Sequence, residues 1–141
     1  MGGVRLDHDR GPVAHSDGDV LYHAVTDALL GALGLEDIGQ LFPDDAAENE
    51  GRDSADFVRE AVRLISASGW GVVNLDATVV LERPRIGASK GAIRANLAGL
   101  LGVGVERVNV KGKSHEGVDA IGEGRAIEAH AVVLLASAGQ G

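Results

Sequence analysis

The sequence predicts one α+β domain over residues 1–141, in which a mixed β-sheet carries helices packed on one face. Three observations favour this class. The chain has 141 residues, which is the size of a single domain, and it contains no repeat or linker. Two helix patterns follow a short first strand, and a third helix pattern lies between later strands. Glycine is abundant, with 21 residues, and aromatic residues are rare, so small aliphatic side chains must pack helices against a sheet or subunits against one another.

The individual elements follow from the spacing of apolar residues and from the residues that begin and end each pattern. Ser16 with Asp19 three residues later fits a capping box, so the first helix is expected to begin just after Ser16, and Gly34 is placed as its stop. Pro84 and Gly87 break the chain before another helix. The expected elements are a strand at 4–6, helices at 17–33 and 54–68, a strand at 72–81, a helix at 89–101, strands at 107–113 and 126–136, and loops at 35–53 and 114–125.

Composition narrows the chemistry that the chain can perform. The absence of cysteine excludes disulfides, thiolate metal sites and cysteine nucleophiles, and it leaves His, Asp and Glu as metal ligands. A net charge of -8 disfavours a nucleic-acid surface. Because no apolar run reaches the length of a membrane helix and no signal or transit segment opens the chain, we expect a cytoplasmic protein with no membrane partner.

The first helix carries the strongest functional signal. His15 and Ser16 precede its N-terminus, where unpaired N–H groups and partial positive charge favour a phosphate, although ordinary capping fits equally well. His23 follows on the polar face, between Asp19 and Asp27. It is either a metal ligand, with the two aspartates orienting its ring, or a member of a surface ion pair.

Two later segments are more polar than a linker requires. Asp37, Ile38 and Gly39, with the group Phe42–Asp44 shortly after them, can accept sugar hydroxyls close to the backbone or form a capped turn. The turn 81–87 follows a strand, and its backbone groups can read a flat base, which taken alone is a weak signal.

The segment Lys111–Gly117 joins a strand end to two lysines, a hydroxyl and a carboxylate. It can clamp a diphosphate, with Glu116 holding a divalent ion, whereas His115 is equally well a surface residue. A base-activated serine nucleophile is disfavoured, because neither Ser16 nor Ser114 lies in a Gly-x-Ser-x-Gly elbow.

Four motifs occur together in this chain. They are Ala-His-Ser-Asp-Gly-Asp-Val-x-x-His-(x)3-Asp-Ala-Leu-Leu-Gly at 14–31, Asp-Ile-Gly-x-x-Phe-Pro-Asp at 37–44, Asn-Leu-Asp-Ala-Thr at 74–78 and Asn-Val-Lys at 109–111. Together they closely resemble the 2-C-methyl-D-erythritol 2,4-cyclodiphosphate synthase family of the non-mevalonate isoprenoid pathway. The resemblance runs from Gly2 to the last strand.

The resemblance implies a homotrimer with its active sites between subunits. The family's reaction cyclises 4-diphosphocytidyl-2-C-methyl-D-erythritol 2-phosphate by attack of the 2-phosphate on the β-phosphorus, and CMP leaves. Since the substrate carries its own nucleophile, the enzyme has to align the phosphates and neutralise their charge. Zinc and a second ion, magnesium or manganese, would supply positive charge that an acidic protein lacks.

By motif, the resemblance also implies the residue roles. His15 and Ser114 would be catalytic, with Ser114 at the family's threonine position; His23 would bind zinc, and Glu116 would bind magnesium or manganese. Four groups would contact the methylerythritol phosphate, the sugar, the cytosine and the diphosphate in turn, and the group that holds the cytosine would come from the neighbouring subunit. These substrate-binding residues are His15 and Ser16; Asp37, Ile38, Gly39, Phe42, Pro43, Asp44, Asp45 and Ala46; Leu81, Glu82, Arg83, Pro84, Arg85, Ile86 and Gly87; and Lys113, Ser114, His115 and Glu116.

Two departures from the family pattern matter. The family has a strand ending in Asp-x-His roughly twenty residues ahead of Gly2, and those two residues complete its zinc site. We therefore expect this chain to be N-terminally incomplete, to bind zinc poorly and to turn over slowly or not at all; the group Asp7–Asp9 falls at a turn instead. Many members also carry Arg-Gly-Glu where this chain has Glu123–Arg125, so no role is assigned there.

Two functions remain open at this stage. The first is the synthase itself, and the second is a non-catalytic trimeric module that keeps the nucleotide pocket but has lost zinc. His15, Asp44, Ser114 and Glu116 favour the synthase, because a domain released from catalysis has no physical need for them.

Overall fold

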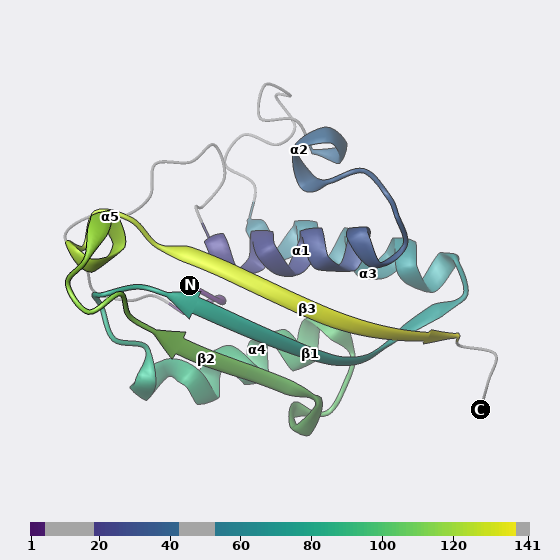
Figure 1. Cartoon of the computed structure of the whole chain (residues 1–141). Coiled ribbons are helices and arrows are strands. Elements are labelled where there is room, and N and C mark those ends of the chain that lie inside the picture. The colour runs from purple at the N-terminus through teal and green to yellow at the C-terminus, as the bar shows by residue number, and fades with distance from the viewer. Residues whose placement is uncertain (5–18, 43–52, 138–141) are drawn as a thin grey trace.

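The computed structural model describes residues 1–4, 19–42 and 53–137, which form a sheet with helices packed against it (Figure 1). No helix in these ranges is both long and apolar enough to cross a membrane. In chain order the elements are α1 (Val20–Ala32), α2 (Ile38–Leu41), α3 (Ser54–Ala67), β1 (Trp70–Val80), η2 (Gly87–Ser89), α4 (Lys90–Leu101), η3 (Val105–Arg107), β2 (Val108–Lys113), α5 (Asp119–Gly122) and β3 (Glu128–Ser137).

The sheet has the strand order β2-β1-β3 and is mixed, as the sequence predicts. Strand β1 runs parallel to β2, with Ala77 opposite Val110, and antiparallel to β3, with Ala77 opposite Ala131. Because β1 and β2 are parallel, their C-terminal ends meet at one edge of the sheet, where Val80 lies opposite Lys113. The loops that follow both strands therefore meet at that edge.

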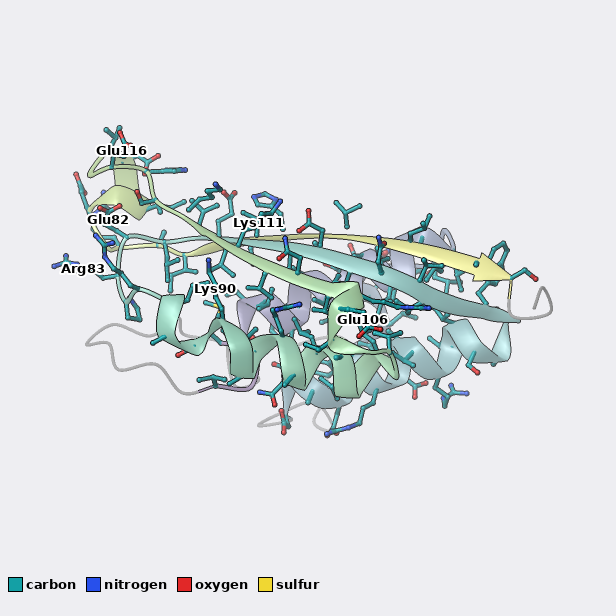
Figure 2. The ribbon with its side chains drawn as sticks, turned by 90° about the horizontal axis from the view of Figure 1, so that it is seen from below. Glu82, Arg83, Lys90, Glu106, Lys111 and Glu116 are labelled. Carbon is teal, nitrogen blue, oxygen red and sulfur yellow. The ribbon has the colours of Figure 1, made fainter. Side chains whose placement is uncertain are left out.

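The two faces of the sheet differ sharply in burial. Along β1, Leu75, Ala77 and Val79 are buried, whereas Asn74 and Asp76, which alternate with them, are exposed. This alternation confirms the prediction of a strand with one buried and one polar face. Helices α1, α3 and α4 all lie on the buried side (Figures 1 and 2), and their apolar residues form one core with the strands. The helical core residues include Leu21, Val25 and Leu29 of α1, Val58, Ala61 and Ile65 of α3, and Ile93, Leu97 and Leu101 of α4.

The start of the first helix differs from the prediction. The helix begins at Val20, and its N-cap is Asp19, which accepts a hydrogen bond from the backbone N–H of Tyr22 at 3.1 Å. The Asp19 carboxylate is buried and also accepts the N–H groups of Gly2, at 2.9 Å, and Gly3, at 3.0 Å. The predicted start just after Ser16 is therefore wrong, because the N-cap is Asp19, which is held by Gly2 and Gly3, far away in the sequence. Ser16, and the capping box predicted at it, lie outside the described residues.

The other predicted elements from residue 54 onward are confirmed to within two residues at each end. The predicted loops at 35–53 and 114–125 each contain a four-residue helix, α2 and α5, that the sequence pattern did not reveal. Gly34 has a φ of 68° just after α1, which confirms it as the stop. Val4 is not part of a strand, and the rest of the strand expected at 4–6 lies outside the described residues.

Candidate functional site

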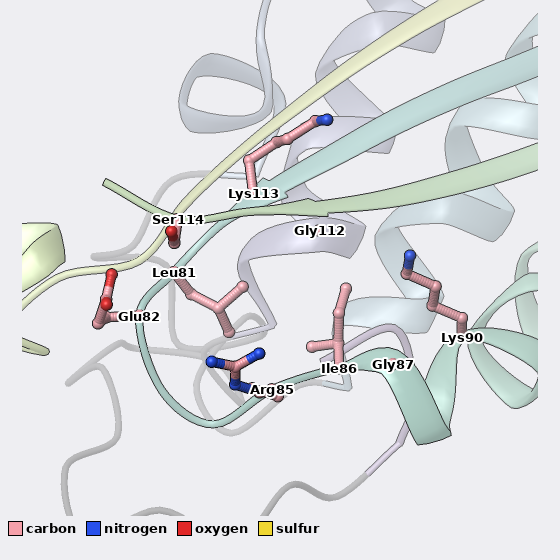
Figure 3. A pocket seen from close by; sticks show the side chains of 9 residues that line it. All are labelled: Leu81, Glu82, Arg85, Ile86, Gly87, Lys90, Gly112, Lys113 and Ser114. Carbon is pink, nitrogen blue, oxygen red and sulfur yellow. The ribbon is translucent and has the colours of Figure 1, made fainter. Parts of the chain in front are cut away.

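A pocket of about 320 Å³ opens at the edge where β1 and β2 end (Figure 3). Its position follows from the parallel pairing of β1 with β2. This pairing continues past the end of β1, because the N–H of Leu81 donates to the carbonyl of Lys113 at 2.9 Å. Ligands commonly bind at the carboxyl ends of parallel strands. We call this site the strand-end pocket, and it is lined by Leu81, Glu82, Arg85, Ile86, Gly87, Lys90, Gly112, Lys113 and Ser114.

The inner wall of the strand-end pocket is apolar and tightly packed. Leu81 and Ile86 are 5% and 3% exposed. Gly112 of β2 lies directly against Ile86, since a Cβ at this glycine would sit 3.1 Å from Ile86 Cγ1. The absence of a side chain at Gly112 thus lets the turn after β1 close onto β2, which gives the pocket an apolar wall.

Three cationic residues line the pocket beside this wall. Arg85 and Lys90 approach the pocket from different sides, whereas Lys113 extends over the other side of β2 (Figure 3). The ion pairs between described residues all involve other side chains. Two side-chain cations at one hollow, Arg85 and Lys90, without an ion-pair partner among the described residues of a chain of net charge -8, favour an anionic ligand.

Glu82 adds an acceptor to the same pocket. Its Oε2 atom is buried and has no hydrogen-bond partner in the described part of the chain. Leaving a buried acceptor unsatisfied costs about 1–3 kcal/mol, so a bound group that donates a hydrogen bond would relieve this cost. The pocket therefore combines an apolar wall, the positive charge of Arg85 and Lys90, and one buried hydrogen-bond acceptor.

The loop after β2 continues from the pocket and holds the remaining predicted residues. The Ser114 hydroxyl accepts the N–H of Glu116 at 3.3 Å, and His115 Nδ1 lies 2.8 Å from Asp119 Oδ2. The hydrogen bond to His115 is the main cause that holds the pKa of the Asp119 carboxyl below its usual value. Glu116 lies at the same end of the sheet as Glu82 and Arg83 (Figure 2).

The two residues whose charges are reversed relative to many family members pair with each other. Arg125 Nε donates to Glu123 Oε2 at 2.7 Å, and both side chains are more than half exposed. Beside them, the Arg83 guanidinium lies against Gly124, where a Cβ would be 3.1 Å from Arg83 Nη2. Glu123 and Arg125 do not line the strand-end pocket.

His23 lies apart from this pocket, between α1 and α3. Its Nε2 atom is 2.9 Å from the hydroxyl of Ser54, which is fully buried, and its ring centroid is 5.9 Å from that of Phe57. Phe42 packs against Phe57, and the centroids of their two rings are 4.7 Å apart. We call His23, Ser54, Phe57 and Phe42, with Asp27, the helix-side cluster.

The acidic residues predicted near His23, Asp19 and Asp27, bind backbone groups, and so does Asp37 of the predicted sugar-binding group. Asp27 Oδ1 accepts the N–H of Ile38 at 2.7 Å and so ties α1 to α2. Asp37 caps α2 by accepting the N–H of Gln40 at 3.0 Å, within a complete capping box. Among the described residues, the structure brings together no group of three His, Asp or Glu side chains that would hold a metal ion. These residues alone therefore do not form a zinc site around His23, because zinc takes three or four ligands.

The structure thus separates the predicted site residues into two places. Most of the turn 81–87 shares the strand-end pocket with Lys113 and Ser114, whereas Asp37, Ile38, Gly39 and Phe42 do not line it. Lys90 and Gly112 line the pocket but were missed; the basic cluster around 83–90 was the available signal for Lys90. His15, Ser16, Pro43, Asp44, Asp45 and Ala46 lie outside the described residues.

Comparison with known proteins shows which family the chain resembles. The model of the YgbB family matches residues 1–136. The chain is 55% identical over 135 residues to the chloroplastic 2-C-methyl-D-erythritol 2,4-cyclodiphosphate synthase of Arabidopsis thaliana, covering 96% of this chain and 58% of that protein. It is 51% identical over 138 residues to the synthase of Chromobacterium violaceum, covering 98% of this chain and 87% of that protein.

A solved structure of a 2-C-methyl-D-erythritol 2,4-cyclodiphosphate synthase in a form bound to CDP has the same fold. Its TM-score with this chain is 0.88 at 39% identity, and the match covers 96% of this chain and 87% of that one. The chain spans about three-fifths of the length of the chloroplastic relatives, from 57% to 61%.

Proposed function

The chain belongs to the YgbB family, and on this premise we propose that it is a 2-C-methyl-D-erythritol 2,4-cyclodiphosphate synthase. It would cyclise 4-diphosphocytidyl-2-C-methyl-D-erythritol 2-phosphate to the 2,4-cyclodiphosphate and release CMP. The observation that carries the proposal is the strand-end pocket, whose unpaired cations and buried acceptor match the chemistry of a cytidine diphosphate. A cytoplasmic location is part of the proposal, although the plant relatives are named chloroplastic.

In this proposal the cytosine lies against the apolar wall formed by Leu81 and Ile86. The buried Glu82 Oε2 favours a nucleobase that carries an exocyclic amino group, because such a group would donate the hydrogen bond that this oxygen lacks. Arg85 and Lys90 offset phosphate charge, and backbone groups of the turn orient the base. These residues align the diphosphate, which is the main requirement of phosphoryl transfer.

The diphosphate itself is assigned to Lys113, Ser114, His115 and Glu116. Because the Ser114 hydroxyl accepts the N–H of Glu116, its own proton is left for a phosphate oxygen. The exposed Glu116 carboxylate fits magnesium or manganese, since such ions are held by one or two carboxylates together with substrate phosphates. When bound, this ion would neutralise charge on the phosphates.

Zinc has less support from the described residues. We keep His23 as its proposed ligand, but the described residues supply no further ligand beside it, so no step of the reaction is derived through zinc. The Ser54 hydroxyl bonds to Nε2 of the ring and fixes the ring plane, as a partner of a ligating histidine does. Zinc content of the purified protein, with and without the His23→Ala substitution, tests this assignment.

We further propose that the active site is completed across a homotrimer interface. The sugar-binding group Asp37–Gly39, Phe42 and residues 43–46, together with His15 and Ser16, would come from one subunit and the strand-end pocket from its neighbour. Two features support this arrangement. Asp37–Gly39 do not line the strand-end pocket. On the face of the sheet that the helices do not cover, which we call the open sheet face, Val132 is 72% and Leu134 is 56% exposed. Apolar residues on an uncovered sheet face favour burial against another copy of the chain.

The activity is tested by following CMP release from the cytidine diphosphate substrate by chromatography, with magnesium or manganese present. Release of CMP with formation of the cyclic diphosphate supports the synthase, and loss of release in Ser114→Ala and Glu116→Gln links it to this loop. Tight CDP binding without any turnover would instead support the non-catalytic nucleotide-binding module. The absence of a three-residue metal group among the described residues is what keeps that second candidate open.

The trimer is tested by measuring the molar mass of the protein in solution by light scattering. The substitution Val132→Lys is expected to lower the mass to that of one chain while circular dichroism stays unchanged, because Val132 lies on the open face opposite Asp76. Val132→Thr, which nearly preserves shape, is the matched control. A wild-type protein that is monomeric at micromolar concentration would contradict the trimer.

A further inference from the structure

The loop between β2 and β3 holds two non-glycine residues in the left-handed backbone region. Glu116 has a φ of 52° and Asp119 a φ of 64°. Residues with a side chain rarely adopt this conformation, because Cβ then crowds a carbonyl oxygen, so such residues persist only where their surroundings fix them. Strained backbone of this kind is concentrated at active sites and ligand-binding segments.

The Asp119 carboxylate is the centre of the contacts that fix the loop. Its oxygens lie 2.8 Å and 3.0 Å from His115 Nδ1, and Oδ1 also accepts the N–H groups of Ile121 at 2.9 Å and Gly122 at 3.3 Å. One side chain therefore ties the residue directly before Glu116 to the first turn of α5. Aspartate also tolerates the left-handed region better than most residues, because its short side chain bonds to nearby backbone.

Backbone contacts close the same loop and leave little space inside it. The N–H of Val118 donates to the carbonyl of His115 at 3.0 Å. Gly122 packs onto the backbone of Gly117, so a Cβ at Gly122 would collide with it. Glu116 lies between His115 and Gly117, and both neighbours are held in place. The backbone direction of Glu116 is therefore set by the loop and not by contacts of its own side chain.

We propose that Asp119 is a positioning residue, which through His115 fixes residues 114–117 so that the Ser114 hydroxyl and the Glu116 carboxylate address the same bound diphosphate. The inference rests on the proposed function in one respect, which is that Glu116 binds the divalent ion. The two functional groups are already coupled, since the N–H of Glu116 donates to the Ser114 hydroxyl at 3.3 Å. Because Ser114 lines the strand-end pocket, a change in the conformation of the loop would also alter this pocket.

The test compares substitutions that remove different properties of Asp119. Asp119→Asn keeps tolerance of the left-handed backbone and can still accept the two N–H groups, but it loses the charge that holds His115. Asp119→Gly removes the carboxylate and relieves the backbone strain. Glu116→Gln is the reference for the ion, and Glu60→Gln, a partly exposed acid of α3 paired with Arg63, is the control for loss of one negative charge.

Two ligand measurements separate positioning from stability. The affinity of the CDP-bound protein for Mn²⁺, measured by electron paramagnetic resonance of free Mn²⁺, is expected to fall about fivefold in Asp119→Asn and at least as much in Asp119→Gly, because a charge-assisted hydrogen bond is weakened or lost. The affinity for CDP without Mn²⁺ is expected to fall less than the affinity for Mn²⁺, because Ser114 is only one of the residues that line the pocket. The melting temperature is expected to stay close to wild type, because the pair is exposed. Glu60→Gln should change none of these quantities.

His115 provides the second arm of the test. If Asp119 acts through His115, the double variant His115→Ala/Asp119→Asn binds Mn²⁺ no more weakly than the weaker-binding single variant. Losses that multiply in the double variant would overturn the proposal. So would wild-type Mn²⁺ affinity in Asp119→Gly, since the backbone conformation and not the carboxylate would then be sufficient.

Failure of the proposed ion site can be recognised separately. If Glu116→Gln leaves Mn²⁺ affinity unchanged, the assignment of Glu116 as ion ligand is wrong, and the positioning role is then decided by hydrogen exchange of the loop. The amides of Glu116 and Gly117 must exchange faster in Asp119→Asn than in wild type for the proposal to stand. Unchanged exchange would overturn it.

Discussion

The strand-end pocket and the helix-side cluster each combine apolar side chains with polar or charged ones but differ in how the polar groups are paired. In the pocket, Arg85 and Lys90 lie beside a hollow and one oxygen of Glu82 is buried, all three without a partner among the described residues. In the cluster, His23 bonds to Ser54 and Asp27 bonds to the backbone of Ile38. Unpaired groups around a hollow are available to a ligand, whereas the paired groups of the cluster stabilise the fold and, at His23, hold the ring of a proposed zinc ligand. The contrast separates binding of CDP from stability within one small domain.

The largest expected effect is on stability and lies in the helix-side cluster. Phe57 is 4% exposed and contacts the rings of both His23 and Phe42. Phe57→Ala should lower the free energy of unfolding by about 3–5 kcal/mol, because it leaves a cavity between α1 and α3. Urea denaturation measures this loss, and Phe57→Leu, which keeps most of the volume, should lose much less. Equal losses in both variants would contradict the packing role.

The next effect is on binding and lies in the strand-end pocket. Arg85→Gln and Lys90→Gln should each weaken CDP binding about tenfold, which corresponds to about 1.4 kcal/mol and is typical of one charge-assisted contact. Cytidine, which has no phosphate, should bind equally to wild type and variants. Calorimetry with both ligands checks this, and Arg63→Gln on the exposed side of α3 is the control. An equal loss for cytidine would show that the cations do not bind phosphate.

A smaller effect is expected from the hydrogen bond inside the helix-side cluster. Ser54→Ala should lower the free energy of unfolding by about 1 kcal/mol, because it removes the partner of His23 Nε2 at a fully buried position. The affinity for CDP should not change, since Ser54 does not line the pocket. Ser66→Ala, an exposed position of the same helix, serves as the control. A loss of CDP affinity in Ser54→Ala alone would break the separation of the two regions.

The smallest effect concerns an ion pair that belongs to neither region. On the open sheet face, the hydrogen bond from Lys111 holds the pKa of Asp76 below its usual value. A lowered pKa stabilises the fold above the ordinary carboxyl range, and this contribution disappears as the pH falls through the lowered pKa. Melting curves of wild type and Asp76→Asn should therefore differ slightly at pH 7 and converge at pH 2. A difference that persists at pH 2 would point to a cause other than this charge.

Much of the fold could be predicted because its signals are local. The apolar spacing of α3 and α4 and the alternation of β1 are set by residues a few positions apart, and their predicted ranges agree with the structure. The start of α1 could not be predicted in this way, because Asp19 is held by Gly2 and Gly3. The short helix α5 was also missed, since its Asp119 is fixed by His115 in a loop that has no periodic pattern.

By itself, the sequence determined the fold class, the chemistry available without cysteine and the family, since the motifs at 14–31, 37–44, 74–78 and 109–111 are carried by the order of residues alone. Only the tertiary structure decided which of those residues meet. Parallel pairing of β1 with β2 brings the turn after residue 81 to Ser114 and adds Lys90 to the same pocket, while Asp37 and His23 are directed elsewhere. The reason is physical: spacing fixes local geometry, but contacts between distant segments depend on how the sheet and helices pack.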